Sequence, residues 1–548
     1  MTAPAALAGF DEVEAYHDAW WDEIVAQAQA PAEVDIYDKD WRFLSTVDDA
    51  ISGDFTDLYN DAGEGKLAQL AANPVAQWIS ENVTEAEDLH VRVTQSHTEW
   101  AGKAQTIEES MDSDGFESMN ISFLHDLQHA KKIYCYPNPF FLLQVQWPKI
   151  YPYFGPSVTG VKTLLHLNLL RRYQPFWRLP ADIFSKTAWA QDFEAANWPH
   201  IVNPRGTGLF NDTSMHCIIA TRMGNFYDVV KAILEDAGLQ LTATRWLPGD
   251  EQPFPEYATI TMPTLIWDVV DKGGVRGKTG TLLDGFMPFV RSILGDNIQE
   301  TKTPVPYEEP QEYSEDKWGT VKEVPAVVWY AAQRYTTATG TGQSGIVKWR
   351  KTQHKAIASA ILTGGKSPGW VNTGVKLIAN AILGYIGMIF LNPGLALGIF
   401  DEQIEDVILA FARADLTNLR DEMGRDAYGE YWESSGQNGF SPSTLAAFRT
   451  GQMAVQPYTS FQVEVVNGQP YWYGMHAVMG DRVSMELGMS GVLYTDQIRT
   501  ARLTFGPNDP VGWTLAVGKD DDDTSPTARL ARVLQAVSTI AQQIAVQS

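Results

Sequence analysis

The chain has 548 residues, of which 44% are hydrophobic and 20% charged, and its formal net charge is −26. This composition excludes a disordered chain and suits three or four globular domains at roughly 100–200 residues each. Because broad phosphate binding needs clustered Lys and Arg, the acidic balance argues against sequence-specific binding of nucleic acid.

The first segment is expected to be an amphipathic helix within residues 1–31. Apolar and aromatic residues recur at helical spacing from Phe10 to Ala28, and Pro31 follows them. Met1–Phe10 lacks the basic and long apolar regions of a secretory signal peptide. The chain is therefore expected to be made in a cytoplasm.

The following segment, residues 32–133, is predicted to be a β-rich domain. Val34–Val47 has the composition of two strands around a turn at Asp38–Asp40. Apolar residues then alternate with polar ones from Leu89 to Val93, and a further strand is expected to run through Trp100.

Residues 134–300 are predicted to form an α+β domain. It begins with Tyr134–Pro156, where prolines and aromatic residues are so dense that we expect an ordered connector without long helices or central strands. A buried strand is expected over Met215–Ala220. The spacing from Phe226 to Ala237 predicts a helix that ends at Gly238, and a strand is expected over Leu239–Trp246.

Residues 301–400 are interpreted as a linker and an acid-free apolar insertion. Thr301–Glu323 is rich in Pro and acidic residues, but the 77 residues from Val324 to Phe400 contain no Asp or Glu, where the chain average predicts roughly nine (67/548 × 77). The insertion ends in the most apolar run of the chain, whose candidate contact residues are Leu377, Ile378, Ile382, Leu383, Ile386, Met388, Ile389, Phe390 and Leu391. Asn392-Pro393-Gly394 would break a spanning helix. Two interpretations of this insertion stay open: it is a membrane-active element, or it is a hairpin buried inside an assembly.

Residues 401–519 are predicted to combine a helix with a β-hairpin domain. The periodicity predicts an acidic amphipathic helix over Asp401–Met423. Asn467-Gly468 predicts a type I′ turn between strands at Phe461–Val466 and Gln469–Tyr473, and a further strand is expected over Ile498–Phe505.

The last segment, residues 520–548, is predicted to be an acidic loop followed by a C-terminal amphipathic helix. The helix carries a short heptad seam of Leu530, Leu534, Val537, Ala541 and Ile544. The seam either packs on its own domain or joins symmetry mates in a homotrimer.

The motifs that suggest chemistry are incomplete. Gly273–Thr279 has three residues between its glycines where a phosphate-binding loop has four. His125 and His129 lie one helical turn apart, but Asp126 stands where a zinc protease has glutamate, so structural histidines are favoured. We therefore expect no catalytic, cofactor-binding or metal-binding residues and no enzyme activity.

Several long aromatic motifs carry a family resemblance. Phe123–Phe141, Tyr153–Ser157, Arg245–Asp250 and Asn467–Tyr473 resemble the Gp37-like minor tail proteins of mycobacteriophages and related actinobacterial siphophages. The resemblance extends over most of the chain, from Val34 to Phe505.

This resemblance implies a multidomain tail hub of α+β class, with β-barrel-like modules, α+β insertions and a C-terminal helix. Such a protein would be a homotrimeric baseplate hub at the tail tip of the virion. It would adapt the tail tube and distal tail protein to the tip, meet the tape measure protein and anchor other tail-tip or fibre proteins during host attachment and genome delivery. The alternatives are a tail-associated cell-wall hydrolase and a tip protein that contacts the host membrane through Val324–Phe400.

Overall fold

The computed structural model describes residues 30–173, 195–208, 211–277, 325–331, 344–364, 411–433, 454–488, 490–507 and 512–519, with isolated positions and two short strand backbones elsewhere. Most of the predicted N-terminal helix lies outside them. So do the apolar run from Leu377 to Leu391 and the C-terminal seam from Leu530 to Ile544, which stay predictions.

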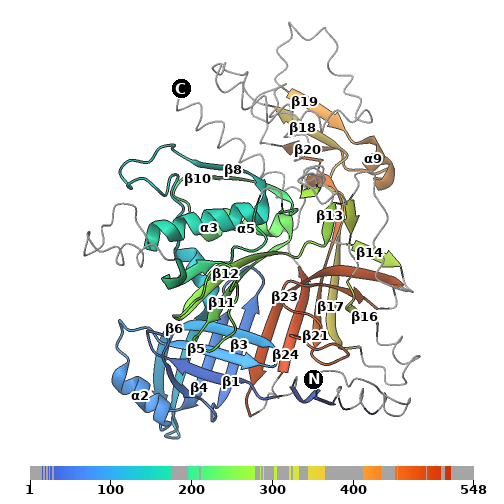
Figure 1. Ribbon diagram of the computed structural model, residues 1–548. Coiled ribbons are helices and arrows are strands. Elements are labelled where there is room, and N and C mark those ends of the chain that lie inside the picture. The colour runs from blue at the N-terminus through green and yellow to red at the C-terminus, as the bar shows by residue number, and fades with distance from the viewer. Residues whose placement is uncertain are drawn as a thin grey trace.

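A 14-stranded sheet, here called the large sheet, draws its strands from both ends of the described chain (Figure 1). Its main path has the order β17-β21-β24-β23-β3-β4-β7-β6-β5-β1-β2. The N-terminal strands are β1 (Glu33–Tyr37), β2 (Phe43–Thr46), β3 (Ser52–Leu58), β4 (Glu64–Leu70), β5 (His90–Gln95), β6 (Thr98–Met111) and β7 (Glu117–His125). The later strands are β14 (Thr301–Pro304), β16 (Val328–Trp329), β17 (Ile346–His354), β21 (Tyr458–Val466), β22 (Arg482–Glu486), β23 (Val492–Phe505) and β24 (Gly512–Lys519).

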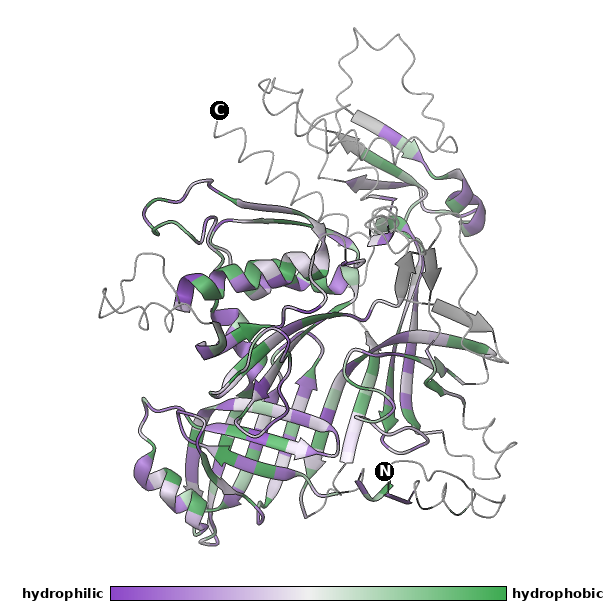
Figure 2. Ribbon diagram, viewed as in Figure 1, coloured by the Kyte–Doolittle hydropathy of each residue, from purple (hydrophilic) through white to green (hydrophobic). Residues whose placement is uncertain are grey.

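The two halves of this sheet join where β23 pairs antiparallel with β3, with Thr500 opposite Leu58. Alternate side chains of each strand point to opposite faces, which appears as alternating hydropathy along the strands in Figure 2. One buried cluster includes Phe55 and Trp100 from the first half and Val463 and Leu515 from the second. The predicted strands at 34–47, 89–100 and 498–505 are confirmed.

A second body, here called the α+β unit, packs beside the large sheet (Figure 1). Its elements are η1 (Asp126–Lys132), β8 (Tyr151–Pro156), α3 (Ser157–Tyr173), η2 (Ala195–Asn197), β9 (His200–Val202), β10 (His216–Thr221), α5 (Phe226–Ala237), β11 (Leu239–Trp246) and β12 (Thr264–Asp271). Gly238 caps α5 with φ 66°, the left-handed conformation that favours glycine, so the predicted helix end is confirmed. The predicted strands at 215–220 and 239–246 are also confirmed.

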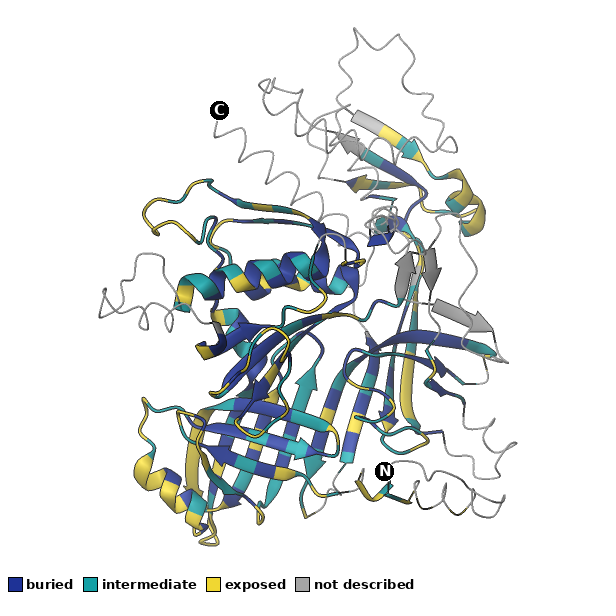
Figure 3. Cartoon of the chain, viewed as in Figure 1, coloured by how far each residue is buried: buried dark blue, intermediate teal, exposed yellow. Residues whose placement is uncertain are grey.

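Shorter elements complete the described fold, and Figure 3 shows exposed residues gathered on two helices, α2 and α9. Asn73 caps α2 (Pro74–Asn82) by accepting the Val75 N–H, with Pro74 in the first turn. The remaining elements are β13 (Val275–Gly277), β15 (Thr320–Lys322), β18 (Ala360–Gly364), β19 (Phe411–Asp415), α9 (Thr417–Met423) and β20 (Glu430–Glu433). No helix among the described residues has both the length and the apolarity needed to cross a bilayer.

The predicted hairpin around Asn467-Gly468 is wrong. The strand β21 pairs with β17 and β24, whereas Gln469–Tyr473 forms no strand. A turn is present at Asn467-Gly468, where Gly468 has φ 80°, but Asn467 lacks the positive φ that a type I′ turn requires, so the predicted turn type is wrong as well. Pro470 has no N–H to donate to a ladder, and both edges of β21 are occupied by strands from elsewhere in the chain.

The predicted helix over Asp401–Met423 is also wrong in part. Phe411–Asp415 is the strand β19, paired antiparallel with β18, and only Thr417–Met423 is helical among the described residues there. The backbone hydrogen bonds of β19 come from a partner about fifty residues away, which helical periodicity does not reveal.

Two predicted connectors contain strands. The segment predicted as a linker, 301–323, contributes β14 to β23 and β15 to β13. The Pro- and aromatic-rich connector ends in β8, which pairs with β10. The described part of the chain is thus mostly β-sheet, in several sheets, with helices in the minority. The barrel-like modules, the C-terminal helix and the domain boundaries remain predictions.

Candidate functional site

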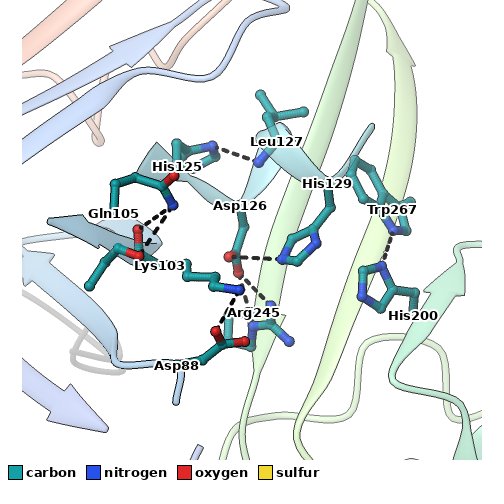
Figure 4. Close-up of polar contacts among 11 residues, drawn as sticks. Asp88, Lys103, Gln105, His125, Asp126, Leu127, His129, His200, Arg245 and Trp267 are labelled. Atoms are coloured by element: carbon teal, nitrogen blue, oxygen red, sulfur yellow. Dashed lines mark hydrogen bonds and ion pairs between the residues drawn. The ribbon is translucent and has the colours of Figure 1, made fainter. Parts of the chain in front are cut away.

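A buried ionic cluster joins the large sheet to the α+β unit (Figure 4). Asp126 begins η1 directly after β7, and Arg245 lies on β11. The Arg245 guanidinium donates to Asp126 Oδ2 from Nε at 3.0 Å and from Nη2 at 2.6 Å. Their side chains are 4% and 0% exposed. This ion pair therefore fixes η1, the first element after β7, to β11 in a dry environment inside the α+β unit.

The charge on Asp126 depends on its partner. Burial by itself would raise the pKa of Asp126, but the neighbouring groups, the Arg245 guanidinium first among them, together hold the pKa below its usual range. Breaking a buried ion pair by removing one partner is costly because the other charge stays in a poorly solvating interior. Each partner is therefore needed once the other is present.

The cluster continues into an aromatic stack. The Arg245 guanidinium lies 4.2 Å from the Trp41 ring centroid, a favourable cation–π geometry. Trp41 in turn stacks on His90 of β5, with centroids 4.3 Å apart and planes at 18°. Burial lowers the pKa of His90 to about 4, so this ring is neutral at neutral pH.

Two more histidines border the ion pair. His129 Nε2 lies 3.8 Å from Asp126 Oδ1, and its ring meets the His200 ring edge-on at 4.9 Å. The Trp267 indole Nε1–H donates to His200 Nδ1 at 3.3 Å. Burial lowers the pKa of His200 to about 2, and it lowers the pKa of His129 despite the nearby carboxylate. The cluster therefore holds one ion pair among neutral rings.

The two histidines that suggested zinc have other roles. His125 Nδ1 accepts the Leu127 N–H at 3.2 Å and so caps η1, whereas His129 faces Asp126. Within the described ranges, no three His, Cys, Asp or Glu side chains are arranged to hold a metal ion. Cys135 and Cys217 are buried free thiols, and burial raises the pKa of Cys135 to about 12. Neither is a poised nucleophile.

A second set of buried polar contacts crosses the same boundary. Asn60, after β3, donates from Nδ2 to the Leu239 carbonyl at 2.7 Å and accepts the Leu241 N–H at 2.7 Å. The Tyr59 hydroxyl donates to the same Leu239 carbonyl at 2.8 Å. Arg499 Nη1 lies 2.9 Å from Glu235 Oε2. The sheet and the unit therefore share directional contacts at several points.

The sequence did not predict this cluster. In the sequence, Asp126 only departs from a zinc-protease motif, and Arg245 only belongs to a motif shared with the family. The available signal was a single charge inside an apolar stretch, which is rare in a core unless the charge is paired. The partner could not be named, because 119 positions separate the two residues.

Residues 33–519 match the protein family described as "Siphovirus ReqiPepy6 Gp37-like protein". The chain belongs to this family. It is 26% identical over 534 residues to "Minor tail protein Gp28" of Mycobacterium phage D29, covering 86% of this chain and 88% of that protein. It is 25% identical over 532 residues to the protein of the same name from Mycobacterium phage L5, covering 86% and 87%.

Solved structures similar to this Gp37-like protein include phage tail proteins. One is the tail protein from Neisseria meningitidis MC58, with TM-score 0.38 and 8% identity over 91% of this chain and 99% of that one. Another is the 43 kDa tail protein of prophage MuSo2 from Shewanella oneidensis, with TM-score 0.37 and 10% identity over 91% and 99%. The family assignment rests on the sequence matches alone.

Proposed function

We propose that this Gp37-like protein is a structural minor tail protein that forms the baseplate hub at the tail tip of a long-tailed phage. The observation that carries the proposal is the family match over residues 33–519. Two relatives, both named minor tail proteins, also align with this chain over most of their length. In this role the protein is made in the host cytoplasm and becomes part of the virion.

The buried contacts support a scaffold role. The Asn60 contacts tie the large sheet to the α+β unit with buried, directional hydrogen bonds, and the Asp126–Arg245 pair fixes η1 to β11 where the chain enters that unit. Interfaces of this kind resist sliding, because displacement would leave polar groups unpaired. A hub that transmits force between the tail tube and the tip needs such rigidity.

The proposed assembly is a homotrimer. It adapts the tail tube and the distal tail protein to the tip, meets the tape measure protein and anchors other tail-tip or fibre proteins. Through these contacts it contributes to host attachment and genome delivery. The hydrolase reading, and membrane contact through Val324–Phe400, remain predictions from the sequence.

Two measurements test the hub. Native mass spectrometry of the purified full chain is expected to give a trimer, and gold-labelled antibodies against the chain are expected to mark the distal end of the tail in electron micrographs of virions. Phage particles incubated with pre-immune antibodies are the control. A stable monomer, together with label that avoids the tail tip, would contradict the proposal.

A further inference from the structure

One loop of the α+β unit exposes its apolar side chains. Between Pro137 and Pro148, the exposed fractions are 50% for Leu142, 54% for Leu143, 61% for Val145 and 69% for Trp147. Single exposed apolar residues are common on soluble proteins, but a contiguous group marks a contact site.

Two amide side chains of this loop, Asn138 and Gln146, bond to its own backbone. Asn138 Oδ1 accepts the Phe140 N–H at 3.0 Å, and Asn138 Nδ2 donates to the Trp147 carbonyl at 2.8 Å. Gln146 Nε2 donates to the carbonyls of Phe141 at 3.1 Å and Leu142 at 2.9 Å. These backbone groups can leave water without losing their partners, which is the condition for entering an apolar medium.

The base of the loop is fixed to the α+β unit. The Tyr136 N–H donates to Asn168 Oδ1 of α3 at 3.0 Å, and the Arg171 guanidinium lies 3.7 Å from the Tyr136 ring centroid. The Cys135 N–H donates to the Gly224 carbonyl at 2.8 Å. The loop is therefore held in place before any partner arrives.

The chain around the loop carries no carboxylate. From Leu127 to Ala181, 55 residues contain no Asp or Glu, where the chain average predicts about seven (67/548 × 55). The same stretch contains the cations Lys131, Lys132, Lys149, Lys162, Arg171, Arg172 and Arg178. Lys131 and Lys162 pair with Asp61 and Asp268 from outside the stretch, whereas Lys132 and Arg172 are exposed. Pairing of Tyr151 with Thr221 brings the turn after β10 beside the loop base, and that turn adds the exposed residues Arg222 and Met223. A basic, apolar region thus stands out in a chain of net charge −26.

We propose that the loop from Pro137 to Pro148 is a membrane-contact loop that inserts into a lipid surface with anionic headgroups. Leu142, Leu143 and Val145 enter the acyl boundary, while Trp147 and the cations near the base meet the headgroup layer. The loop is apolar at its exposed side chains, and its neighbourhood complements phosphate charge. This contact lies in the interface rather than across the bilayer, and it does not depend on the hub role.

A lipid surface fits better than a protein groove. Two of the three amide side chains in the loop, Asn138 and Gln146, are already bonded to the loop itself. The loop therefore offers few hydrogen-bonding side chains to a protein partner. Protein interfaces, in contrast, typically carry about one hydrogen bond per 100–200 Å². Lipid insertion needs only apolar area and a favourable charge.

The test uses the full chain with a reporter in the loop. Because both native cysteines are buried, Leu143→Cys supplies an accessible thiol for an environment-sensitive fluorophore. Vesicles of equal parts phosphatidylcholine and phosphatidylglycerol are expected to shift its emission to the blue, with a weaker response to phosphatidylcholine alone. Leu142→Ser with Val145→Ser is expected to weaken vesicle co-sedimentation by about a hundredfold, the factor for two lost apolar side chains.

Phe43→Cys, labelled in the same way, is the matched control. Phe43 is 59% exposed, but it follows Asp38 and Asp40 on the large sheet, so its probe is expected to stay in water. Three outcomes would overturn the proposal. They are no shift at Leu143→Cys, an equal shift at both probes, or a shift that follows protein concentration without vesicles, which would mean that a second copy covers the loop.

Discussion

The ionic cluster and the membrane-contact loop both depart from the usual distribution of side chains, in which charged residues are exposed and apolar residues are buried. The cluster buries charges, and the loop exposes apolar side chains. The cluster buries Asp126 and Arg245 between η1 and β11, and the loop exposes Leu143 and Trp147 to solvent. In both places selected polar groups pair within the protein: Asp126 Oδ2 accepts from Arg245, and the Asn138 and Gln146 amides bond to the backbone of their own loop. The comparison separates contacts that hold the chain together from contacts that await another surface.

The two regions should respond oppositely to substitution. A buried ion pair makes each partner indispensable, because the remaining charge has no water to solvate it. An exposed apolar side chain adds little to the free energy of unfolding, because it is solvated in both the folded and the unfolded state. Changes in the cluster should therefore affect stability, and changes in the loop should affect only binding.

The largest effect is expected for Arg245→Met. This substitution leaves Asp126 buried without its cation and should lower the free energy of unfolding by about 3–5 kcal/mol, measured by urea denaturation at neutral pH. Arg205→Met is the matched control, because Arg205 pairs with Glu256 at the surface. Equal midpoints for the two variants would show that the buried ion pair does not stabilise the fold.

The next effect concerns pH and His90. The pKa of His90 is lowered by burial to about 4, so the unfolded chain takes up a proton below its ordinary pKa of about 6.5 while the folded chain does not. The contribution of His90 to the free energy of unfolding is therefore fully present above about pH 6.5. It is lost as the pH falls from about 6.5 to 4, by about 1.4 kcal/mol per pH unit.

His90→Phe keeps a ring beside Trp41 and removes the titration. The variant should lose stability less steeply between about pH 6.5 and 4, which urea denaturation across that range would measure. His97→Phe is the control, since His97 is exposed. Parallel pH profiles for the wild-type chain and His90→Phe would contradict the expected burial effect.

A smaller loss is expected for Asn60→Ala. Asn60 has φ 58° and satisfies both Leu239 and Leu241 of β11, so alanine would add backbone strain and leave the Leu241 N–H unpaired. The free energy of unfolding should fall by about 2–3 kcal/mol. Asn82→Ala removes only an exposed contact with the Trp78 carbonyl and serves as control.

The smallest effect is expected in the loop. Leu142→Ser with Leu143→Ser should change the free energy of unfolding by less than about 0.5 kcal/mol, because both side chains are already exposed. Leu67→Ala, at a position that is 1% exposed, should cost about 2–5 kcal/mol in the same assay. Strong destabilisation by the loop substitutions would mean that the loop belongs to the core.

Local sequence signals predicted local structure well. The α5 helix and its end at Gly238 followed from apolar spacing and from the freedom of glycine at positive φ. The strands around 34–47 and 498–505 followed from alternation. The hairpin at Asn467-Gly468 was wrong because a turn signal shows where a chain reverses and not which strands pair.

The candidate site was largely outside the reach of sequence patterns. Asp126 and Arg245 meet only because η1 and β11 pack together in the folded chain. The exposed face of the 137–148 loop was also hidden, since apolar residues in a sequence are ordinarily read as core. Exposure is a property of the folded molecule. Because the 137–148 loop is exposed, we propose a contact surface within a segment that the sequence predicts only as a connector.

The sequence by itself determined the family, the acidic character and the position of many strands, because these depend on residue identity and short-range periodicity. Only the tertiary structure decided that β23 joins β3, that one arginine neutralises one buried aspartate and that a proline-rich loop faces water. The physical reason is that pairing, burial and exposure depend on which distant segments meet, and that choice minimises the free energy of the whole chain rather than of any local window.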